Sequence, residues 1–168
     1  GTSVLETSQT ASNNTGVGHH ALKANTSGTR NVGVGSFSLA ANTTGDDNTA
    51  IGGSALAVVT SGQENVAVGT FSLDANTSGA SNVALGANAL DAATTVDNNV
   101  AIGADALTSC TTGTANVAIG RFTLASSTTA SNNTGVGHNA LGSNTDGTQN
   151  VAVGAFALDA NTSGGPNN

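Results

Sequence analysis

Residues 65–81 have the sequence NVAVGTFSLDANTSGAS, and a unit of this kind recurs along the whole chain without an insertion or a deletion. Self-similarity at a fixed period is the signature of a repeat architecture, in which each turn of the chain packs on its neighbours. The unit is 17 residues long, and its positions are numbered here from the asparagine that opens it. This asparagine recurs as Asn14, Asn31, Asn48, Asn65, Asn82, Asn99, Asn116, Asn133 and Asn150, and again as Asn167.

Three further positions do not vary in nine consecutive repeats: position 5 is glycine, position 9 is leucine and position 13 is threonine. The glycines are Gly18, Gly35, Gly52, Gly69, Gly86, Gly103, Gly120, Gly137 and Gly154. The leucines are Leu22, Leu39, Leu56, Leu73, Leu90, Leu107, Leu124, Leu141 and Leu158.

The repeats predict one array over residues 1–168, with no second domain. It consists of a partial coil at 1–13, full coils that start at residues 14, 31, 48, 65, 82, 99, 116, 133 and 150, and a partial coil at 167–168. Solenoids need polar capping turns to stay soluble, and neither end resembles one. We therefore expect this chain to be a segment of a longer array.

Positions 2 to 4 predict a short strand, because branched aliphatic residues or Thr alternate there with Ala or Gly. We expect positions 2 and 4 to face inward and position 3 to face outward, with a second short strand at positions 8 and 9. Glycine at position 5 would adopt a positive φ, and positions 12 to 15, typically NTSG, are turn residues. The pattern predicts an all-β protein, a β-solenoid or β-roll of about ten 17-residue coils.

Two columns are expected to hold the coils together. The opening asparagines predict a ladder in which each side-chain amide bonds the equivalent group in the coils above and below. The leucines at position 9 would close the core. Coil handedness is left open by the sequence.

Position 3 is never larger than alanine, which suggests that another surface approaches it closely, most simply another copy of the chain in a homotrimer. The Phe residues at position 7 alternate with polar residues, so they could lie at an exposed corner, at an interface or inside the coil. The candidate interface residues are Ala50, Ala67, Ala84, Ala101, Ala118 and Ala152, with Phe37, Phe71, Phe122 and Phe156.

The segments NVAVG, NTAIG, NVAIG and NVALG resemble the NSVAIG-type motif in the heads of trimeric autotransporter adhesins, which repeat at a shorter interval. Whole units such as NTAIGGSALAVVTSGQE, residues 48–64, resemble the NTAIGxxALxxNTTGxx repeats of phage and virus tail fibres and of bacterial surface proteins. The resemblance implies a trimeric roll, left-handed in the adhesin heads, without catalytic residues in its repeats. It also implies an extracellular adhesive or spacer role on a virion, a phage fibre or a cell surface, with a receptor or glycan as a further partner.

Composition excludes several classes of function. The net charge is −7 with only three basic residues, which argues against nucleic acid as a partner. No apolar run is long enough to cross a bilayer, so no membrane insertion is expected. The single Cys110 cannot form a disulfide within the chain.

No set of residues predicts an enzyme, a cofactor or a metal site. His19 and His138 share position 6 but lie seven coils apart, and a ring of His19 or His20 around a trimer axis is a less favoured alternative. Asp74, Asp91 and Asp159 share position 10, where a solvated edge is favoured over a Ca²⁺ site.

The competing function is an ice-binding or other flat-surface-binding solenoid that uses the nine stacked threonines at position 13. Such a face would be expected to present two outward threonine columns two residues apart. Here the second Ser or Thr follows at the adjacent position 14, which points the other way in a strand. The sequence therefore favours a structural and adhesive fibre segment.

Overall fold

The structure, a computed structural model, describes residues 2–7 and 10–167, so Gly1 and Asn168 of the two partial coils lie outside the described residues. Nine three-residue strands follow one another at 17-residue steps, and the described residues contain no helix. The strands are β1 (Thr15–Val17), β2 (Val32–Val34), β3 (Thr49–Ile51), β4 (Val66–Val68), β5 (Val83–Leu85), β6 (Val100–Ile102), β7 (Val117–Ile119), β8 (Thr134–Val136) and β9 (Val151–Val153).

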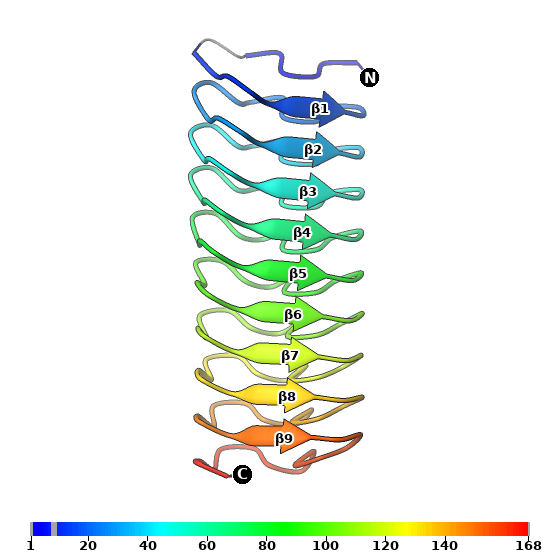
Figure 1. Ribbon diagram of the computed structural model, residues 1–168, viewed down its shortest axis with the longest axis vertical. Coiled ribbons are helices and arrows are strands. Elements are labelled where there is room, and N and C mark those ends of the chain that lie inside the picture. Colours follow the sequence, from blue (N-terminus) through cyan, green and yellow to red (C-terminus); the bar gives the residue numbers. More distant parts are fainter. Residues whose placement is uncertain (1, 8–9, 168) are drawn as a thin grey trace.

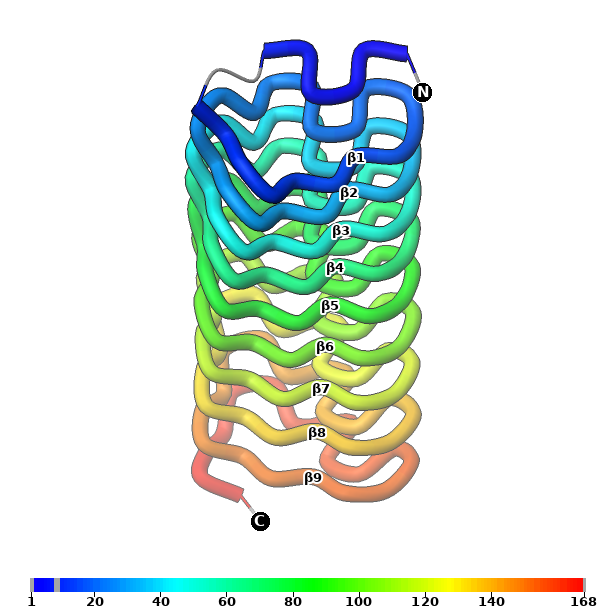
Figure 2. Tube along the Cα trace, turned by 45° about the horizontal axis from the view of Figure 1, so that its top comes forward, coloured from blue at the N-terminus to red at the C-terminus, as the bar shows by residue number. Residues whose placement is uncertain are grey.

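Each strand pairs in parallel with the next, and together they form one nine-stranded sheet in chain order. The register matches equivalent repeat positions, so that Ala67 lies beside Ala84 and Val68 beside Leu85. In Figure 1 the chain runs along each strand at the front, returns behind it and descends, which makes the coil left-handed. Figure 2 shows the successive turns stacked on one another with the same outline. The predicted all-β solenoid fold is confirmed.

The expected second strand at positions 8 and 9 is wrong. Leu90 and its equivalents have a positive φ, 54° at Leu90, which is incompatible with a strand and bends the chain into a turn. The backbone is still bonded from coil to coil, because the N–H of Leu90 donates to the carbonyl of Ala106 at 3.0 Å.

Left-handed backbone conformations recur three times in each full coil at residues other than glycine, except in the last coil, where position 17 is Pro166 and only two occur. Positions 7, 9 and 17 have φ near +55°, as in Asn88, Leu90 and Asn98. Glycine at position 5 has φ between 127° and 139°, and a Cβ on Gly69 would collide with the carbonyl oxygen of Gly86. These bends let a 17-residue chain close into a flat coil, and they explain why position 9 is Leu and not a β-branched residue.

The two faces of the strand are opposite to the sequence expectation. Ala84 at position 3 is completely buried, whereas Leu85 at position 4 is 44% exposed. A Cβ built on Gly33, another position-3 residue, would lie 3.1 Å from Oγ of Ser38 and 3.4 Å from Cγ of Leu22. Position 3 therefore faces positions 8 and 9 across a coil so thin that only Ala or Gly fits opposite the leucines.

This burial corrects the predicted interface. The position-3 alanines lie inside the coil and cannot contact another chain: Ala50, Ala67, Ala84, Ala101 and Ala118 have no exposed surface, and Ala152 has 3%. The leucines at position 9 pack against them in one continuous core. From Leu22 to Leu141 they are fully buried, whereas Leu158 is 37% exposed.

Candidate interaction surface

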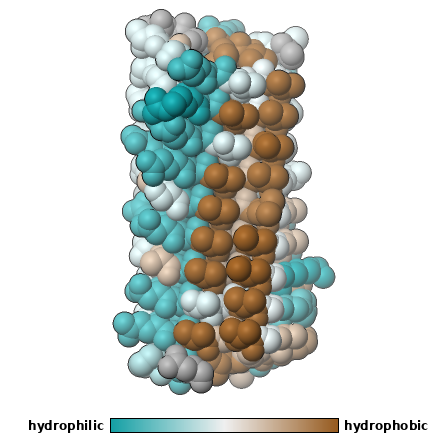
Figure 3. Space-filling model, in the orientation of Figure 1, coloured by the Kyte–Doolittle hydropathy of each residue, from teal (hydrophilic) through white to brown (hydrophobic). Residues whose placement is uncertain are grey.

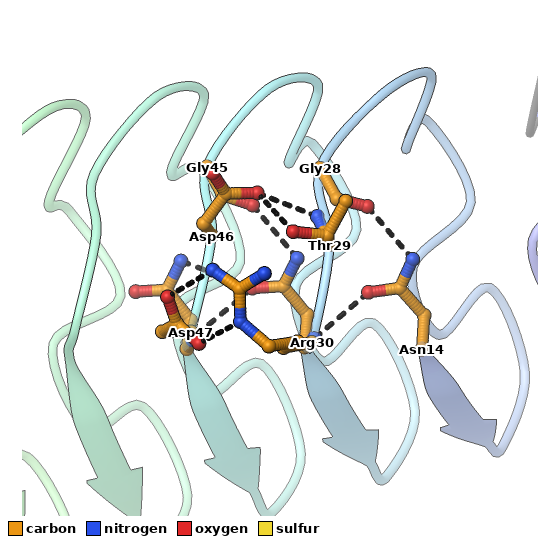
Figure 4. Close-up of polar contacts among 9 residues, drawn as sticks. Asn14, Gly28, Thr29, Arg30, Gly45, Asp46 and Asp47 are labelled. Atoms are coloured by element: carbon orange, nitrogen blue, oxygen red, sulfur yellow. Dashed lines mark hydrogen bonds and ion pairs between the residues drawn. The ribbon is translucent and has the colours of Figure 1, made fainter. Parts of the chain in front are cut away.

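The opening asparagines form a hydrogen-bonded ladder through the interior. Oδ1 of Asn48 accepts both the backbone N–H of Asn65, at 3.1 Å, and its Nδ2, at 3.0 Å. Nδ2 of Asn65 also donates to the carbonyl of Gly79 within its own coil, at 2.8 Å. Figure 4 shows the beginning of the ladder, where Asn14 bonds Gly28. The buried amides therefore fix the stacking of one coil on the next.

A second, interrupted ladder at position 12 was not predicted, because the sequence indicates only that positions 12 to 15 are turn residues. Asn25 and Asn42 are fully buried, and Nδ2 of Asn42 donates to Oδ1 of Asn25 at 3.2 Å. Repeats that lack asparagine at this position interrupt the ladder with Val59, Ala93, Cys110 and Ser127. One sequence signal was available: every asparagine at position 12 is followed by glycine at position 15.

The threonines at position 13 form a third ladder, on the outside of the coil. The hydroxyl of Thr77 donates to the carbonyl of Thr94 at 3.0 Å, and the same bond recurs between adjacent coils from Thr26 to Thr162. The hydroxyl hydrogens of this column are therefore engaged within the chain. The stacked threonines consequently contribute to coil stacking, whatever else contacts them.

The outward side chains of the strands form a continuous apolar surface, which we call the apolar stripe. It consists of two columns, position 2 (Val or Thr) and position 4 (Val, Ile or Leu), and Figure 3 shows one column unbroken along the rod and the other interrupted by paler residues. Ile51, Leu85 and Ile119 are 41%, 44% and 38% exposed. The stripe comprises Thr15, Val17, Val32, Val34, Thr49, Ile51, Val66, Val68, Val83, Leu85, Val100, Ile102, Val117, Ile119, Thr134, Val136, Val151 and Val153.

The phenylalanines at position 7 lie at a corner of the coil and not in its core. Phe37, Phe71 and Phe156 are exposed, and Phe122 is half-buried. The Phe37 ring meets the His20 ring edge-on at 5.1 Å, and the Arg121 guanidinium lies 4.2 Å from the centre of the Phe122 ring. Of the alternatives that the sequence left open, the structure excludes the interior of the coil and leaves the exposed corner and the interface.

The histidines and carboxylates are distributed along the surface. His19 and His20 stack at 3.8 Å, and partial desolvation followed by the neighbouring His19 lowers the pKa of His20. Partial burial, with Asp91 as a second cause, raises the pKa of Asp74. Across residues 2–7 and 10–167, no three His, Cys, Asp or Glu side chains are grouped to hold a metal ion.

Charged residues flank the stripe on the side of position 17. The guanidinium of Arg30 makes two hydrogen bonds of 2.6 Å to the carboxylate of Asp47 in the next coil (Figure 4). Oδ1 of Asp46 accepts the backbone N–H and the hydroxyl of Thr29, also one coil away. These contacts give the stripe a polar border.

Cys110 is buried at position 12, and desolvation raises the pKa of its thiol to about 11. A thiol with such a pKa stays protonated near neutral pH and is a poor nucleophile.

Over the described part of the chain there is no pocket and no helix capable of crossing a bilayer. Comparisons of the chain with models of protein families, with curated proteins and with solved structures find no match.

Proposed function

We propose that this chain is a structural segment of an extracellular fibre, on a virion, a phage or a cell surface, and that its copies assemble as a homotrimer. The observation that carries the proposal is the strict addition of one strand for every 17 residues. The length of the rod is then set by the number of repeats, and nine strands about 4.8 Å apart span roughly 38 Å. Such a rod holds an adhesive tip away from the particle or cell that carries it.

Stiffness follows from how each coil is attached to the next. Backbone bonds of the sheet, the asparagine ladder and the threonine ladder lie at different points of the coil circumference. Bending the rod in any direction would stretch at least one of these columns. The fold is therefore suited to a spacer, and the proposed external partner is a receptor or glycan at the cell surface. We propose no catalytic role, cofactor or nucleic-acid partner.

Association of copies is proposed from the exposed surface and not from position 3, and the number three is proposed from the resemblance of the repeats to trimeric fibre proteins. A continuous apolar stripe on an otherwise polar rod is normally covered in the functional assembly, and symmetric homo-oligomers are the commonest means of covering it. In a trimer the stripes of three rods would be covered around one axis. The charged groups would remain outside.

Small-angle X-ray scattering combined with multi-angle light scattering tests this proposal. We expect a mass of three times 16.0 kDa, or 48 kDa, and the scattering profile of a rigid rod. Deleting one coil, residues 82–98, should keep the fold and shorten the rod by about 4.8 Å. A flexible or globular profile would contradict the spacer function, and a monodisperse monomer at high concentration would contradict the trimer.

A flat-surface-binding function, including ice binding, is the second candidate because of one observation. The stripe, unlike the threonines at position 13, presents two outward columns two residues apart on a flat sheet, as in Thr49 and Ile51. Both functions require the same face, so one protein molecule cannot use it for both at once. Thermal hysteresis well above that of a control protein, shown by a monomer, would favour the second candidate.

A further inference from the structure

We propose that the apolar stripe is the surface through which copies of this chain pack side by side, with their long axes aligned. The inference rests on the proposed fibre function and specifies the interface that this function requires. In the proposed trimer each stripe contacts the stripes of the other two copies around the common axis. The phenylalanine corner and the position-17 border would form the edges of the contact.

The exposed apolar surface is concentrated on this face. Among residues 2–7 and 10–167, seven of the twelve large apolar side chains that are exposed belong to the stripe, and three more are phenylalanines at position 7. None of the eighteen stripe residues is charged, although the chain has a net charge of −7. Protein interfaces share this arrangement of an apolar centre without charges and a polar rim.

The size of the stripe fits the centre of an interface. It is roughly 38 Å long, and its two columns, about 6.6 Å apart, cover with their side chains a band about 11 Å wide, or about 400 Å². A standard interface buries about 800 Å² on each partner. The stripe thus supplies about half of that area, and the flanking columns at positions 17 and 7 are available for the rest.

The shape of the stripe identifies a second copy as its partner. The columns repeat at the strand spacing of about 4.8 Å along the whole rod, so a complementary surface must be flat, apolar and of the same period over that length. Another copy of the stripe meets all three conditions. Because the carboxylates lie at positions 7, 10, 14, 16 and 17, two stripes can meet without burying a charge between them.

The test places two lysines on the stripe and two on another face. Leu85→Lys with Ile119→Lys changes two outward residues of β5 and β7, so the coil should form as before. The matched control is Thr95→Lys with Thr129→Lys, which are exposed at position 14 of the same two coils. Both variants change the net charge equally. Mass is measured by analytical ultracentrifugation across a concentration series, and the fold by circular dichroism.

We expect the parent and the control to assemble, and the stripe variant to associate at least about 100-fold more weakly while it keeps the parent's circular dichroism spectrum. A stripe variant with the parent's mass would overturn the stripe as the interface and leave the fibre function standing. A parent that is monomeric at every concentration would overturn both the stripe interface and the trimer. The rod profile in X-ray scattering would still support a spacer in that case.

Cysteine crosslinking keeps the inference testable if the lysine variant does not fold. In a Cys110→Ala background, Val83→Cys with Leu85→Cys places thiols in both columns of the stripe. The control places them at exposed position 14, with Ser61→Cys and Thr95→Cys. Disulfides between chains under mild oxidation are expected for the stripe pair and not for the control. Equal crosslinking of the two pairs, or none in the stripe pair, would overturn the inference.

Discussion

Asn76 and Gly79 hold each other through two hydrogen bonds: the N–H of Gly79 donates to Oδ1 of Asn76 at 2.8 Å, and Nδ2 of Asn76 donates to the Gly79 carbonyl at 3.1 Å. A Cβ on Gly79 would lie 2.8 Å from that same Oδ1. Such a Cβ would also collide with the carbonyl oxygen of Val96 in the next coil, so glycine at position 15 avoids two clashes, one of them with the asparagine at position 12. In the two full repeats where position 15 is larger, position 12 is small: Ala93 pairs with Val96, and Ser127 with Ala130.

This pairing predicts strong coupling between positions 12 and 15. Gly79→Val should destabilise the coil, because its side chain would meet Asn76 and the backbone of Val96. Adding Asn76→Ala recreates the Ala93 and Val96 pair, so part of the loss should return. We expect a coupling free energy of about 0.5–3 kcal/mol in a double-mutant cycle measured by denaturant unfolding. Simple additivity of the two substitutions would show that the pair does not interact.

Ser127 offers a second prediction, because its buried hydroxyl has no hydrogen-bond partner within the described residues. A buried polar group without a partner costs about 1–3 kcal/mol, so Ser127→Ala should leave stability unchanged or raise it by about 1 kcal/mol. The matched control is Ser72→Ala, since Oγ of Ser72 donates to the Gly69 carbonyl at 2.9 Å. The control should lose stability in thermal unfolding. Equal losses in both variants would contradict the assignment.

Much of the fold could be predicted from the period alone, but the inside and the outside of the strand could not. Alternation shows that Val83 and Leu85 share one face of β5 and Ala84 the other, without showing which face is inside. Burial of large apolar residues is the usual guide, and here it fails because the coil is too thin to hold more than one leucine column. The restriction of position 3 to Ala or Gly was the sequence signal that this position is buried. The restriction arises because positions 8 and 9 lie directly opposite it across the coil.

The candidate surface was missed for the same reason. If positions 2 and 4 face inward, as the sequence predicts, no continuous apolar face remains on the outside. The contact between chains is then predicted at position 3. The left-handed residues could not be predicted from identity either, because Leu90 and Phe71 are not typical of positive φ. The available signals were the absence of β-branched residues at positions 7, 9 and 17 and the recurrence of Asn and Asp at positions 7 and 17.

The two faces of β5 give opposite predictions for adjacent residues. Ala84→Leu would overpack the core and should lower the free energy of unfolding by about 1–3 kcal/mol or more. Leu85→Ala removes a side chain that is 44% exposed, so it should cost far less than the about 2–5 kcal/mol of a buried leucine. Thermal unfolding of a dilute, monomeric sample measures both. A larger loss of stability from Leu85→Ala than from Ala84→Leu would indicate that positions 2 and 4 face the interior.

The backbone at position 9 predicts an unusual penalty for a conservative exchange. Leu90→Ile keeps the volume, and exchanges of this type usually cost less than about 1.5 kcal/mol. At φ = 54° a β-branched side chain clashes with its own backbone, so the loss should exceed that value. Ile102→Leu on β6 is the control, because that strand has ordinary φ angles, and urea unfolding should show little change. Equal effects at the two sites would contradict the positive φ.

The last prediction concerns pH. Partial burial first, and the charge of Asp91 second, raise the pKa of Asp74 above the value of about 3.9 for an unfolded chain. Because the folded pKa is the higher one, ionised Asp74 destabilises the coil, fully above the raised pKa and not at all below about 3.9. Asp74→Asn should therefore raise the midpoint of thermal unfolding at pH 7 and lose this advantage at pH 3. Asp91→Asn, which keeps an acceptor for the hydroxyl of Thr108, should produce part of the same gain by removing the neighbouring charge. A gain from Asp74→Asn that is equally large at pH 3 would mean that packing, and not ionisation, is responsible.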